Sequence, residues 1–349
     1  MSSYSRPVSI VIPAKAGIQL KRESRQGRQV DPRFRGDDMV HVSKKIIFIV
    51  GPTGVGKSVV AVELAKKLNG EIISCDAMQV YREVNIASDK PSAEILNQVA
   101  HHLLNVASVA DNFDVAQFRM LALEAIKNIH AREKLPIIVG GSGMYMTVLL
   151  DGIFESTFKN SAMRQQLEEQ AKDRGLADLY DELKRVDPAV ALKVSPNDQR
   201  RVIRALEVYR LEKKPISDLH KSRQGLWGQY PIFIFALDRP RAELYRRVEE
   251  RIDQMFARGL IEEVRAIHAL PLRLSKTAQV LIGIPEVGGH LKGEYDLVRT
   301  KYLMKLKTRH YVKRQLTWFR RDERMNWLVI AAHETNEHVV QRILENIKK

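Results

Sequence analysis

The sequence predicts an α/β fold built on a doubly wound, parallel β-sheet. Three apolar runs read as buried strands, namely KIIFIV (residues 45–50), EIISCD (71–76) and LPIIVGG (135–141). Helical segments separate these runs, and the alternation of strand and helix is typical of a parallel sheet. Ligands of such sheets bind beyond the carboxyl ends of the strands, so the loops after these runs should share one site.

The remaining elements can be assigned in chain order. Residues 57–68 read as a helix ended by Asn69-Gly70, and residues 116–133 as a second helix. YPIFIFALDRP (230–240) reads as a strand that returns to the core. A helix over 241–259 and a long basic helix from about 295 to 320 follow it, and one strand and one helix complete the tail.

Residues 154–224 differ from the rest, because their pattern is helical with polar faces and contains no strand. We therefore expect a disordered N-terminal extension (1–40), a first part of the core (41–153), a helical insertion (154–224), a second part of the core (225–335) and a C-terminal helix or tail (336–349).

Composition points to a nucleic-acid partner. The 349 residues include 57 Lys and Arg against 42 Asp and Glu, a net charge of +15, and a strongly basic balance favours nucleic acid over mere solubility. The single cysteine, Cys75, excludes a disulfide framework and favours a reducing compartment. No apolar run approaches the ~18 residues of a membrane span. We expect a cytoplasmic monomer.

GPTGVGKS (51–58) is a phosphate-loop motif, with Gly51, Gly56, Lys57 and Ser58 at its fixed positions. Glycines let backbone N–H groups turn toward phosphate oxygens, and the following helix directs its positive end to the same point. Lys57 adds a full charge, and the Ser58 hydroxyl suits Mg²⁺. The motif makes the expected fold P-loop NTPase-like.

The motif does not say which molecule carries the phosphate. The run at 135–141 ends in glycines, without the Walker-B aspartate of nucleotide hydrolases. No guanine-reading Asn-Lys-x-Asp motif is present. Both observations weaken the GTPase and motor-ATPase interpretations, whereas a small-molecule kinase stays open.

Two further polar residues follow predicted strands. Asp76 could ligate Mg²⁺, act as a general base, or merely cap a turn, and the sequence does not separate these roles. Ser142, in GGSGMY, could touch substrate or cap a helix, and the residues alone favour capping. Cys75 reads as a small strand residue without nucleophilic character.

The chain also resembles a known family, the tRNA dimethylallyltransferases, also called tRNA isopentenyltransferases. The resemblance covers about residues 46–327. It is carried by seven motifs in the family's order: GPTGVGKS, SCDAMQVYREVNIASDKP, HHLLNV, FDVAQF, GGSGMYM, NDQRRVIRALEVYR and TRHYVKRQLTWFRR.

The resemblance implies transfer of a five-carbon group from dimethylallyl diphosphate to the N6 amine of the adenosine 3′ to the anticodon, in tRNAs reading codons that begin with U. It places the general base at Asp76 and the family's threonine at Ser142. Mg²⁺ would sit on Ser58. The diphosphate would be held by Gly51, Pro52, Thr53, Gly54, Val55, Gly56, Lys57, Ser58 and Arg251.

The same resemblance implies contacts with the tRNA anticodon stem-loop. The target base should leave its stack, and Met78 and Gln79 are placed to line its channel. The expected tRNA-binding positions are Asp76, Ala77, Met78, Gln79, Ser142, Arg164, Arg200, Arg201, Val202, Ile203, Arg204, Arg309, Lys313 and Arg314. Ala77 and Pro285 depart from the family pattern. We expect each to remove a hydrogen bond, and Pro285 a basic side chain as well.

Two helices carry the basic residues. SPNDQRRVIRALEVYR reads as a helix opened by a capping box from Ser195 to Asp198. In the long helix, a stripe of cations recurs every four residues, so an anion such as RNA phosphate should lie against it. The stripe is Lys301, Lys305, Arg309 and Lys313. Tyr311, Trp318 and Phe319 between them could stack on bases or belong to the core.

We therefore expect a tRNA dimethylallyltransferase. The alternatives are a small-molecule kinase and an RNA-binding ATP switch; the basic helix disfavours the first, and the missing Walker-B acid disfavours both.

Overall fold

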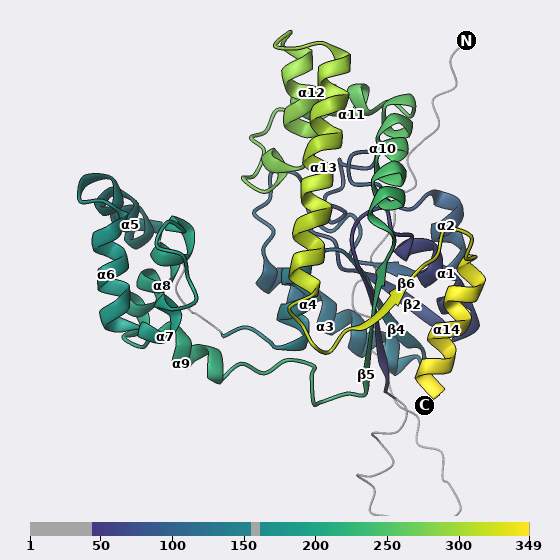
Figure 1. Ribbon diagram of the computed structural model, residues 1–349, viewed down its shortest axis with the longest axis horizontal. Coiled ribbons are helices and arrows are strands. Elements are labelled where there is room, and N and C mark those ends of the chain that lie inside the picture. Colours follow the sequence, from purple (N-terminus) through teal and green to yellow (C-terminus); the bar gives the residue numbers. More distant parts are fainter. Residues whose placement is uncertain (1–43, 155–160, 349) are drawn as a thin grey trace, which may run out of the picture. The chain divides into compact units, whose positions relative to one another are not determined.

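A computed structural model describes residues 44–154 and 161–348. The expected disordered extension, residues 1–40, lies outside this part of the chain. The fold is organised around one six-stranded sheet, drawn in Figure 1. No helix among the described residues is both long enough and apolar enough to cross a membrane.

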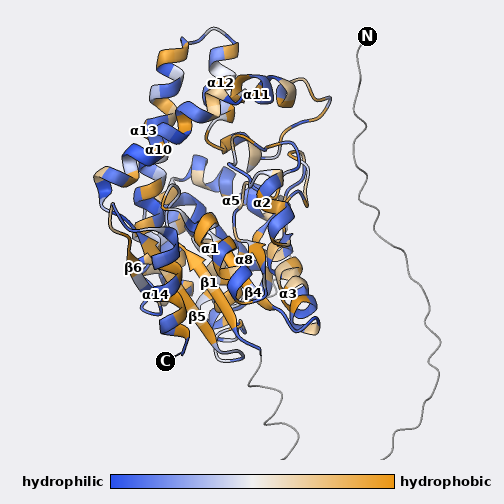
Figure 2. Cartoon of the chain, turned by 90° about the vertical axis from the view of Figure 1, so that its right-hand side faces the viewer, coloured by the Kyte–Doolittle hydropathy of each residue, from blue (hydrophilic) through white to orange (hydrophobic). Residues whose placement is uncertain are grey.

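All six strands run parallel, in the order β3-β2-β4-β1-β5-β6. Their bounds are β1 Ile46–Val50, β2 Gly70–Ser74, β3 His101–His102, β4 Leu135–Gly140, β5 Ile232–Asp238 and β6 Asn326–Val329. Every residue of β1 is buried, as expected for a central strand covered on both faces. The central strands are accordingly the most hydrophobic part of the chain (Figure 2). The predicted parallel α/β fold is confirmed.

The helices of the core connect and cover these strands. They are α1 Lys57–Lys67, α2 Ala93–Gln98, α3 Val115–Ala131, α4 Gly143–Leu150, α10 Arg241–Ala257, α11 Leu260–His268, α12 Ile284–Leu291, α13 Leu297–Phe319 and α14 Asn336–Lys348, with a 3₁₀ turn at Ala278–Val280. The long basic helix, α13, packs along α10 (Figure 1). Short β3 and the helices α2, α11 and α12 have no counterpart among the elements read from the sequence.

Residues 161–221 form five helices with a hydrophobic cluster of their own. They are α5 Ser161–Asp173, α6 Leu176–Val186, α7 Pro188–Ala191, α8 Gln199–Glu212 and α9 Ile216–Lys221. The expected capping box at Ser195 is wrong, because α8 begins four residues later. Asp198 is its N-cap, and the carboxylate accepts the Arg201 N–H at 3.2 Å. A carboxylate at this position also suits the helix dipole better than a hydroxyl.

Candidate active site

The phosphate loop lies between β1 and α1. Gly51 and Gly56 adopt positive φ angles of 141° and 107°, which only glycine tolerates easily. A side chain at Gly51 would also approach the Leu237 carbonyl oxygen to 2.5 Å. The backbone of this loop is therefore fixed by both its conformation and its packing against β5.

Lys57, the first residue of α1, carries the positive charge of the loop. Its Nζ donates to the Pro52 carbonyl oxygen at 2.8 Å, which folds the side chain over the loop. Burial lowers the pKa of Lys57 to about 8, although the nearby Asp76 carboxylate acts in the opposite direction. No acidic side chain among the described residues forms an ion pair with Lys57, so a phosphate oxygen in the cavity would supply its charge partner.

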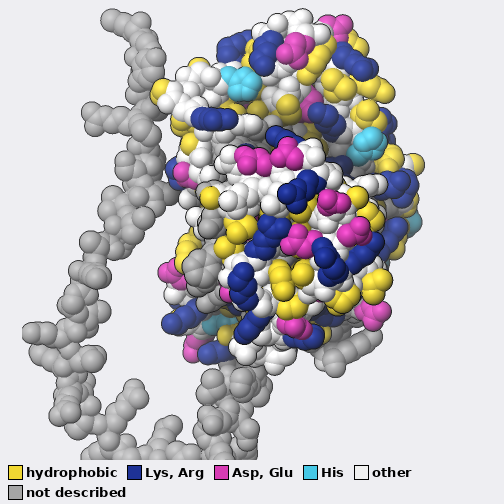
Figure 3. All heavy atoms as spheres, turned by 90° about the vertical axis from the view of Figure 1, so that its left-hand side faces the viewer, with side chains coloured by type: hydrophobic (Ala, Val, Ile, Leu, Met, Phe, Trp, Pro, Cys, Tyr) yellow, Lys and Arg dark blue, Asp and Glu magenta, His cyan; other side chains and the backbone are white. Residues whose placement is uncertain are grey.

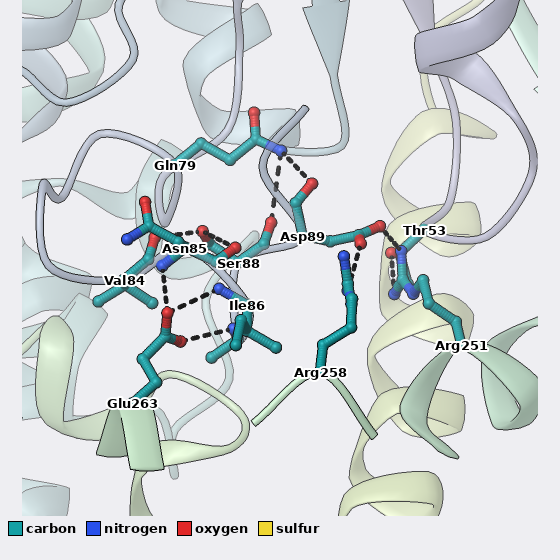
Figure 4. Close-up of polar contacts among 11 residues, drawn as sticks. Thr53, Gln79, Val84, Asn85, Ile86, Ser88, Asp89, Arg251, Arg258 and Glu263 are labelled. Atoms are coloured by element: carbon teal, nitrogen blue, oxygen red, sulfur yellow. Dashed lines mark hydrogen bonds and ion pairs between the residues drawn. The ribbon is translucent and has the colours of Figure 1, made fainter. Parts of the chain in front are cut away.

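Three arginines donate hydrogen bonds to the phosphate loop. Arg239 Nε donates to the Val55 carbonyl oxygen at 3.0 Å, and Arg247 Nε donates to that of Gly54 at 2.8 Å. Arg251 reaches the Thr53 hydroxyl (2.6 Å) with one terminal nitrogen and Asp89 (3.0 Å) with the other (Figure 4). Sequence reasoning singled out Arg251 and missed Arg239, whose only sequence signal is a cation directly after a core strand.

One of the three guanidinium nitrogens of Arg251 makes no hydrogen bond among the described residues. Its Nε is buried and has no hydrogen-bond partner within the described part of the chain. A buried donor without a partner costs roughly 1–3 kcal/mol, so such groups usually await a ligand or water. Arg251 also lines the cavity in front of the loop, so its guanidinium group is placed close to an anion bound there.

A cavity of about 390 Å³ opens in front of the loop. Of the residues expected to bind diphosphate, Thr53, Gly54, Gly56, Lys57, Ser58 and Arg251 line this cavity. Gly51, Pro52 and Val55 are buried behind it and shape the loop. Within residues 44–154 and 161–348, no three His, Cys, Asp or Glu side chains converge as a metal site. A cation here would therefore need oxygens of the ligand beside single protein oxygens such as those of Ser58 and Asp76, which line the cavity.

Asp76 lies two residues beyond β2, between two cavities. It lines the first cavity and also a second one of about 200 Å³. Its Oδ1 accepts the Met78 N–H at 2.8 Å, so it does cap a turn. Burial nevertheless raises its pKa, against the N–H groups of Met78 and Gln79 and the charges of Lys57 and Arg251. A carboxylate with a raised pKa is a stronger base, which suits general-base chemistry.

The role of Ser142 differs from the expectation. It occupies the N-cap position of α4, but its hydroxyl makes no capping bond. Instead, its Oγ accepts the Ala77 N–H at 3.0 Å, beside Asp76. Ser142 and Asp76 both also influence the pKa of Tyr311, which burial raises above its ordinary value. The prediction of simple capping is therefore wrong, because the hydroxyl supports the turn that carries Asp76 instead.

The second cavity is mainly apolar. Its lining includes Met78, Ile252, Met255, Ile282, Met304 and Tyr311, and it shares Thr53, Asp76, Ser88, Asp89 and Arg251 with the first cavity. Asp76 thus faces a polar phosphate site on one side and an apolar space on the other. This arrangement suits a reaction between an anionic donor and a flat, largely apolar acceptor.

Gln79 does not lie where the sequence suggested. It lines the first cavity rather than the second. Its Oε1 accepts the Ser74 hydroxyl at 2.9 Å, and its Nε2 donates to the carbonyl oxygens of Ser88 (3.3 Å) and Asp89 (3.2 Å) (Figure 4). The amide is therefore occupied within the protein. Cys75 is buried with a raised pKa, as expected of an inert strand-end residue.

The stripe on α13 needs correction. Lys301 and Lys305 approach Asp253 of α10 at 3.6 and 2.7 Å, and Arg309 pairs with Glu249 at 3.0 Å. Carboxylates of the same chain are thus the anions that the spacing required, and RNA phosphate is not needed for these three residues.

The far end of the stripe differs. Lys313 and Arg314 are exposed, and no acidic side chain pairs with either in the part of the chain described. The Arg314 guanidinium lies 5.7 Å from the centre of the Tyr311 ring. Phe319 is core, and Trp318 packs against α4. An RNA-facing role thus fits the end of α13 nearest Asp76.

The basic residues of α5 and α8 are only partly free. Arg200 is exposed, whereas Arg201 pairs with Asp198 (3.3 Å) and Arg204 with the buried Glu207 (2.9 Å). Arg164 pairs with Glu168 at 3.3 Å. Figure 3 shows a face on which Lys and Arg side chains alternate with Asp and Glu. The side chains of Val202 and Ile203 are buried in the helical cluster, so the expectation that they contact tRNA is wrong for their side chains.

Pro285 stands in the first turn of α12, where a backbone N–H has no helical partner. The missing donor therefore costs nothing. The Gly283 N–H at the head of this helix donates to Glu286 at 2.7 Å instead. Pro285 thus leaves the hydrogen bonds of the helix itself intact, and the expected loss of a donor toward tRNA stays a prediction.

Comparison with known proteins identifies the family. The model of the family described as IPP transferase matches residues 79–322. The chain belongs to this family. A protein of Alkaliphilus oremlandii named tRNA dimethylallyltransferase is 38% identical over 308 residues, which cover 88% of this chain and 98% of that protein. A protein of the same name from Syntrophomonas wolfei is 41% identical over 303 residues, covering 86% and 96% respectively.

Solved structures of the family share this fold. The full-length tRNA isopentenylpyrophosphate transferase of Bacillus halodurans matches with a TM-score of 0.65 and 35% identity, over 87% of this chain and 96% of that one. A eukaryotic dimethylallyltransferase acting on tRNA matches with a TM-score of 0.75 and 28% identity, over 88% of this chain and 80% of that one. The P-loop-like fold is thus the fold of the family, and the chain is a transferase.

Proposed function

We propose that this protein transfers the dimethylallyl group of dimethylallyl diphosphate to the N6 amine of the adenosine that follows the anticodon in tRNA. The relatives' shared name supports the proposal. The observation that carries it is the position of Asp76 between the phosphate-loop cavity and the apolar cavity.

The donor end of the reaction needs charge neutralisation. When the allylic carbon–oxygen bond breaks, negative charge develops on the departing diphosphate. Lys57, several residues of the loop and Arg251 line the cavity that would hold it. Preorganised donors of this kind lower the barrier most where charge appears in the transition state.

The acceptor end needs a base. The amine nitrogen forms a bond to the allylic carbon as diphosphate leaves, and its surplus proton passes to the Asp76 carboxylate. The raised pKa of Asp76 makes that carboxylate a better proton acceptor than an ordinary surface aspartate. Ser142 holds the Ala77 N–H next to it and so fixes the turn that carries the base.

Magnesium fits this site as a companion of the diphosphate. Mg²⁺ prefers oxygen ligands and usually binds through one or two protein groups together with substrate phosphates. Ser58 would hold it, and the ion would supply additional neutralisation of the leaving group. This proposal matches a site in which the protein alone offers few ligands.

The RNA would be held by exposed cations near the apolar cavity. Lys313 and Arg314 are exposed and have no acidic partner among the described residues, and Arg314 lines the apolar cavity. Arg164, Arg200, Arg201 and Arg204 would contribute more distant contacts. The target base would leave its stack to enter the cavity beside Met78. We propose a cytoplasmic monomer that acts on tRNAs reading codons beginning with U.

The test is a reaction in vitro followed by nucleoside mass analysis. The protein is incubated with unmodified tRNA, Mg²⁺ and either dimethylallyl diphosphate or ATP. We expect one prenylated adenosine per tRNA with the allylic donor and none with ATP. Rapid ATP consumption together with unmodified tRNA would refute the proposal and favour a kinase or an ATP-driven RNA-binding protein.

A further inference from the structure

Gln315 of α13 is a buried amide between two loops of the candidate site. Its side chain is 5% exposed. Its Oε1 accepts the Thr53 N–H at 2.9 Å, and its Nε2 donates to the Gly141 carbonyl oxygen at 2.9 Å. Both halves of the amide are therefore used, each by a different loop.

In the proposed reaction, one of the two loops binds the diphosphate and the other supports the turn of the general base. Thr53 belongs to the phosphate loop, and its hydroxyl holds Arg251. Gly141 directly precedes Ser142, whose hydroxyl holds the turn at Asp76 through Ala77. Gln315 thus connects the donor loop with the loop that supports the base.

The surroundings show that this contact is built closely. A side chain at position 141 would collide with the Gln315 amide, so glycine at this position leaves the space that the amide occupies. Trp318, one turn further along α13, packs on Gly143 in the same manner, and Tyr311, one turn earlier, lines the apolar cavity. One face of α13 therefore spans the site.

We propose that Gln315 is a positioning residue that sets the separation between the diphosphate cradle and Asp76. The inference rests on the proposed transferase activity. A misplacement of ~1 Å between reacting groups can cost about 10²-fold in rate, even when binding is retained. Gln315 touches neither substrate in this account; it acts through Thr53 and Gly141.

The amide chemistry suggests a pair of informative variants. Gln315→Met keeps the approximate length and volume but removes both hydrogen bonds. Gln315→Glu keeps an acceptor for the Thr53 N–H, but its carboxylate faces the Gly141 oxygen with no proton to donate. Once protonated, the same side chain regains a donor, and burial raises the pKa of such a carboxyl group into an accessible range.

The experiment compares these variants with wild type and with a control, Leu316→Val. This control shortens the next buried side chain of α13 and leaves both hydrogen bonds of Gln315 in place. We expect Gln315→Met to lower kcat by about 10²-fold. The KM for the donor should rise by less than tenfold, and tRNA affinity measured without donor should be unchanged. Leu316→Val should lose thermal stability but keep kcat within a fewfold of wild type.

The pH dependence provides the decisive measurement. The kcat of Gln315→Glu, divided by that of wild type at the same pH, should rise as pH falls from about 8 to about 6, because protonation restores the donor. The same ratio for Gln315→Met should stay constant. A kcat loss that matches Leu316→Val, or a Gln315→Glu ratio independent of pH, overturns the positioning role. A wild-type protein that never prenylates tRNA refutes the proposed function instead, so the two failures are distinguishable.

Discussion

Arg251 of α10 donates a hydrogen bond of 2.6 Å to the hydroxyl of Thr53. Thr53 lies in the phosphate loop, 198 residues earlier in the sequence. The same guanidinium binds Asp89, and Asp89 also binds Arg258 at 3.3 Å (Figure 4). The phosphate loop and the loop after β2 thus hold the Arg251 guanidinium from two sides. A ligand would meet a preorganised cation rather than a flexible one, which lowers the entropic cost of binding.

Replacing Asp76 separates catalysis from structure. Asp76→Asn keeps an oxygen that can accept the Met78 N–H, so the turn should survive. The amide cannot take the proton of the amine, and loss of a general base typically costs 10²–10⁴-fold in rate. We expect prenylation to fall by at least that range while tRNA binding in a filter assay stays within a fewfold. A parallel loss of tRNA affinity would show that Asp76 is structural.

Lys57 should determine the alkaline limit of activity. The group is cationic below its pKa of about 8 and loses its charge as the pH rises through that value. The kcat/KM for the donor should therefore decline above about pH 8, because this parameter reports ionisations of the free enzyme. Lys57→Ala should raise the KM for the donor and abolish this alkaline limb. A variant with an unchanged donor KM and an unchanged profile would contradict the role of Lys57.

Much of the fold could be read from local pattern. The buried strands β1, β4 and β5 are continuous apolar runs next to glycines or prolines, and their alternation with helical segments predicts a parallel sheet. β3 has two residues and is exposed enough to lack that signature. Helix α12 was missed although its N-terminal cap is local, because the Gly283 N–H donates to Glu286 only three residues later.

The site divides in the same way. Lys57 and Ser58 were predictable because they belong to one short phosphate-loop motif, and Asp76 because it follows the end of a buried strand. Gln315 was not, since its two partners lie 262 and 174 residues away. The cationic stripe on α13 misled for a related reason: its spacing shows that anions must face it, but only the packing of α10 reveals that Asp253 and Glu249 supply them.

Glu263 of α11 provides a test of whether the segment before Asp89 positions Arg251 for binding the diphosphate donor. Its carboxylate accepts three consecutive N–H groups, those of Asn85 and Ile86 at 2.8 Å and of Ala87 at 2.9 Å (Figure 4). Glu263→Gln replaces one acceptor by a donor that faces these N–H groups. The segment that ends at Asp89 should loosen, and Arg251 should lose its fixed orientation. We expect a severalfold increase in the KM for the donor with little change in tRNA affinity.

The neighbouring residue gives the matched control for that measurement. Glu262 lies on the same helix, is 68% exposed and makes only a long ion pair of 3.9 Å with Arg265 among the described contacts. Glu262→Gln removes the same charge from α11 without touching the loop. Equal effects of the two substitutions on donor KM would mean that net charge, and not the anchored loop, is responsible.

Glu71 at the start of β2 should contribute stability that depends on pH. Burial alone would raise its pKa, but hydrogen bonds from Arg132, His102 and Lys134 outweigh it and lower the pKa to about 2. The folded state therefore holds the carboxylate more tightly deprotonated than the unfolded chain does. This contribution is complete above the unfolded pKa of about 4.5 and is lost as the pH falls toward 2, and a shift of this size corresponds to on the order of 3 kcal/mol.

Urea denaturation at several pH values tests this expectation. Glu71→Gln should lower the free energy of unfolding by about 1–3 kcal/mol at neutral pH, because the amide keeps its size but loses the charge that three cationic or polar partners share. Its difference from wild type should shrink as the pH drops below about 4.5. Glu63→Gln is the control. Glu63 is 41% exposed, and its one ion pair among the described contacts is with Lys66, one turn along α1. Surface ion pairs of this kind contribute under ~1 kcal/mol to the free energy of unfolding. A Glu71 variant as stable as this control at neutral pH would show that the cluster at the base of β2 does not hold the sheet edge.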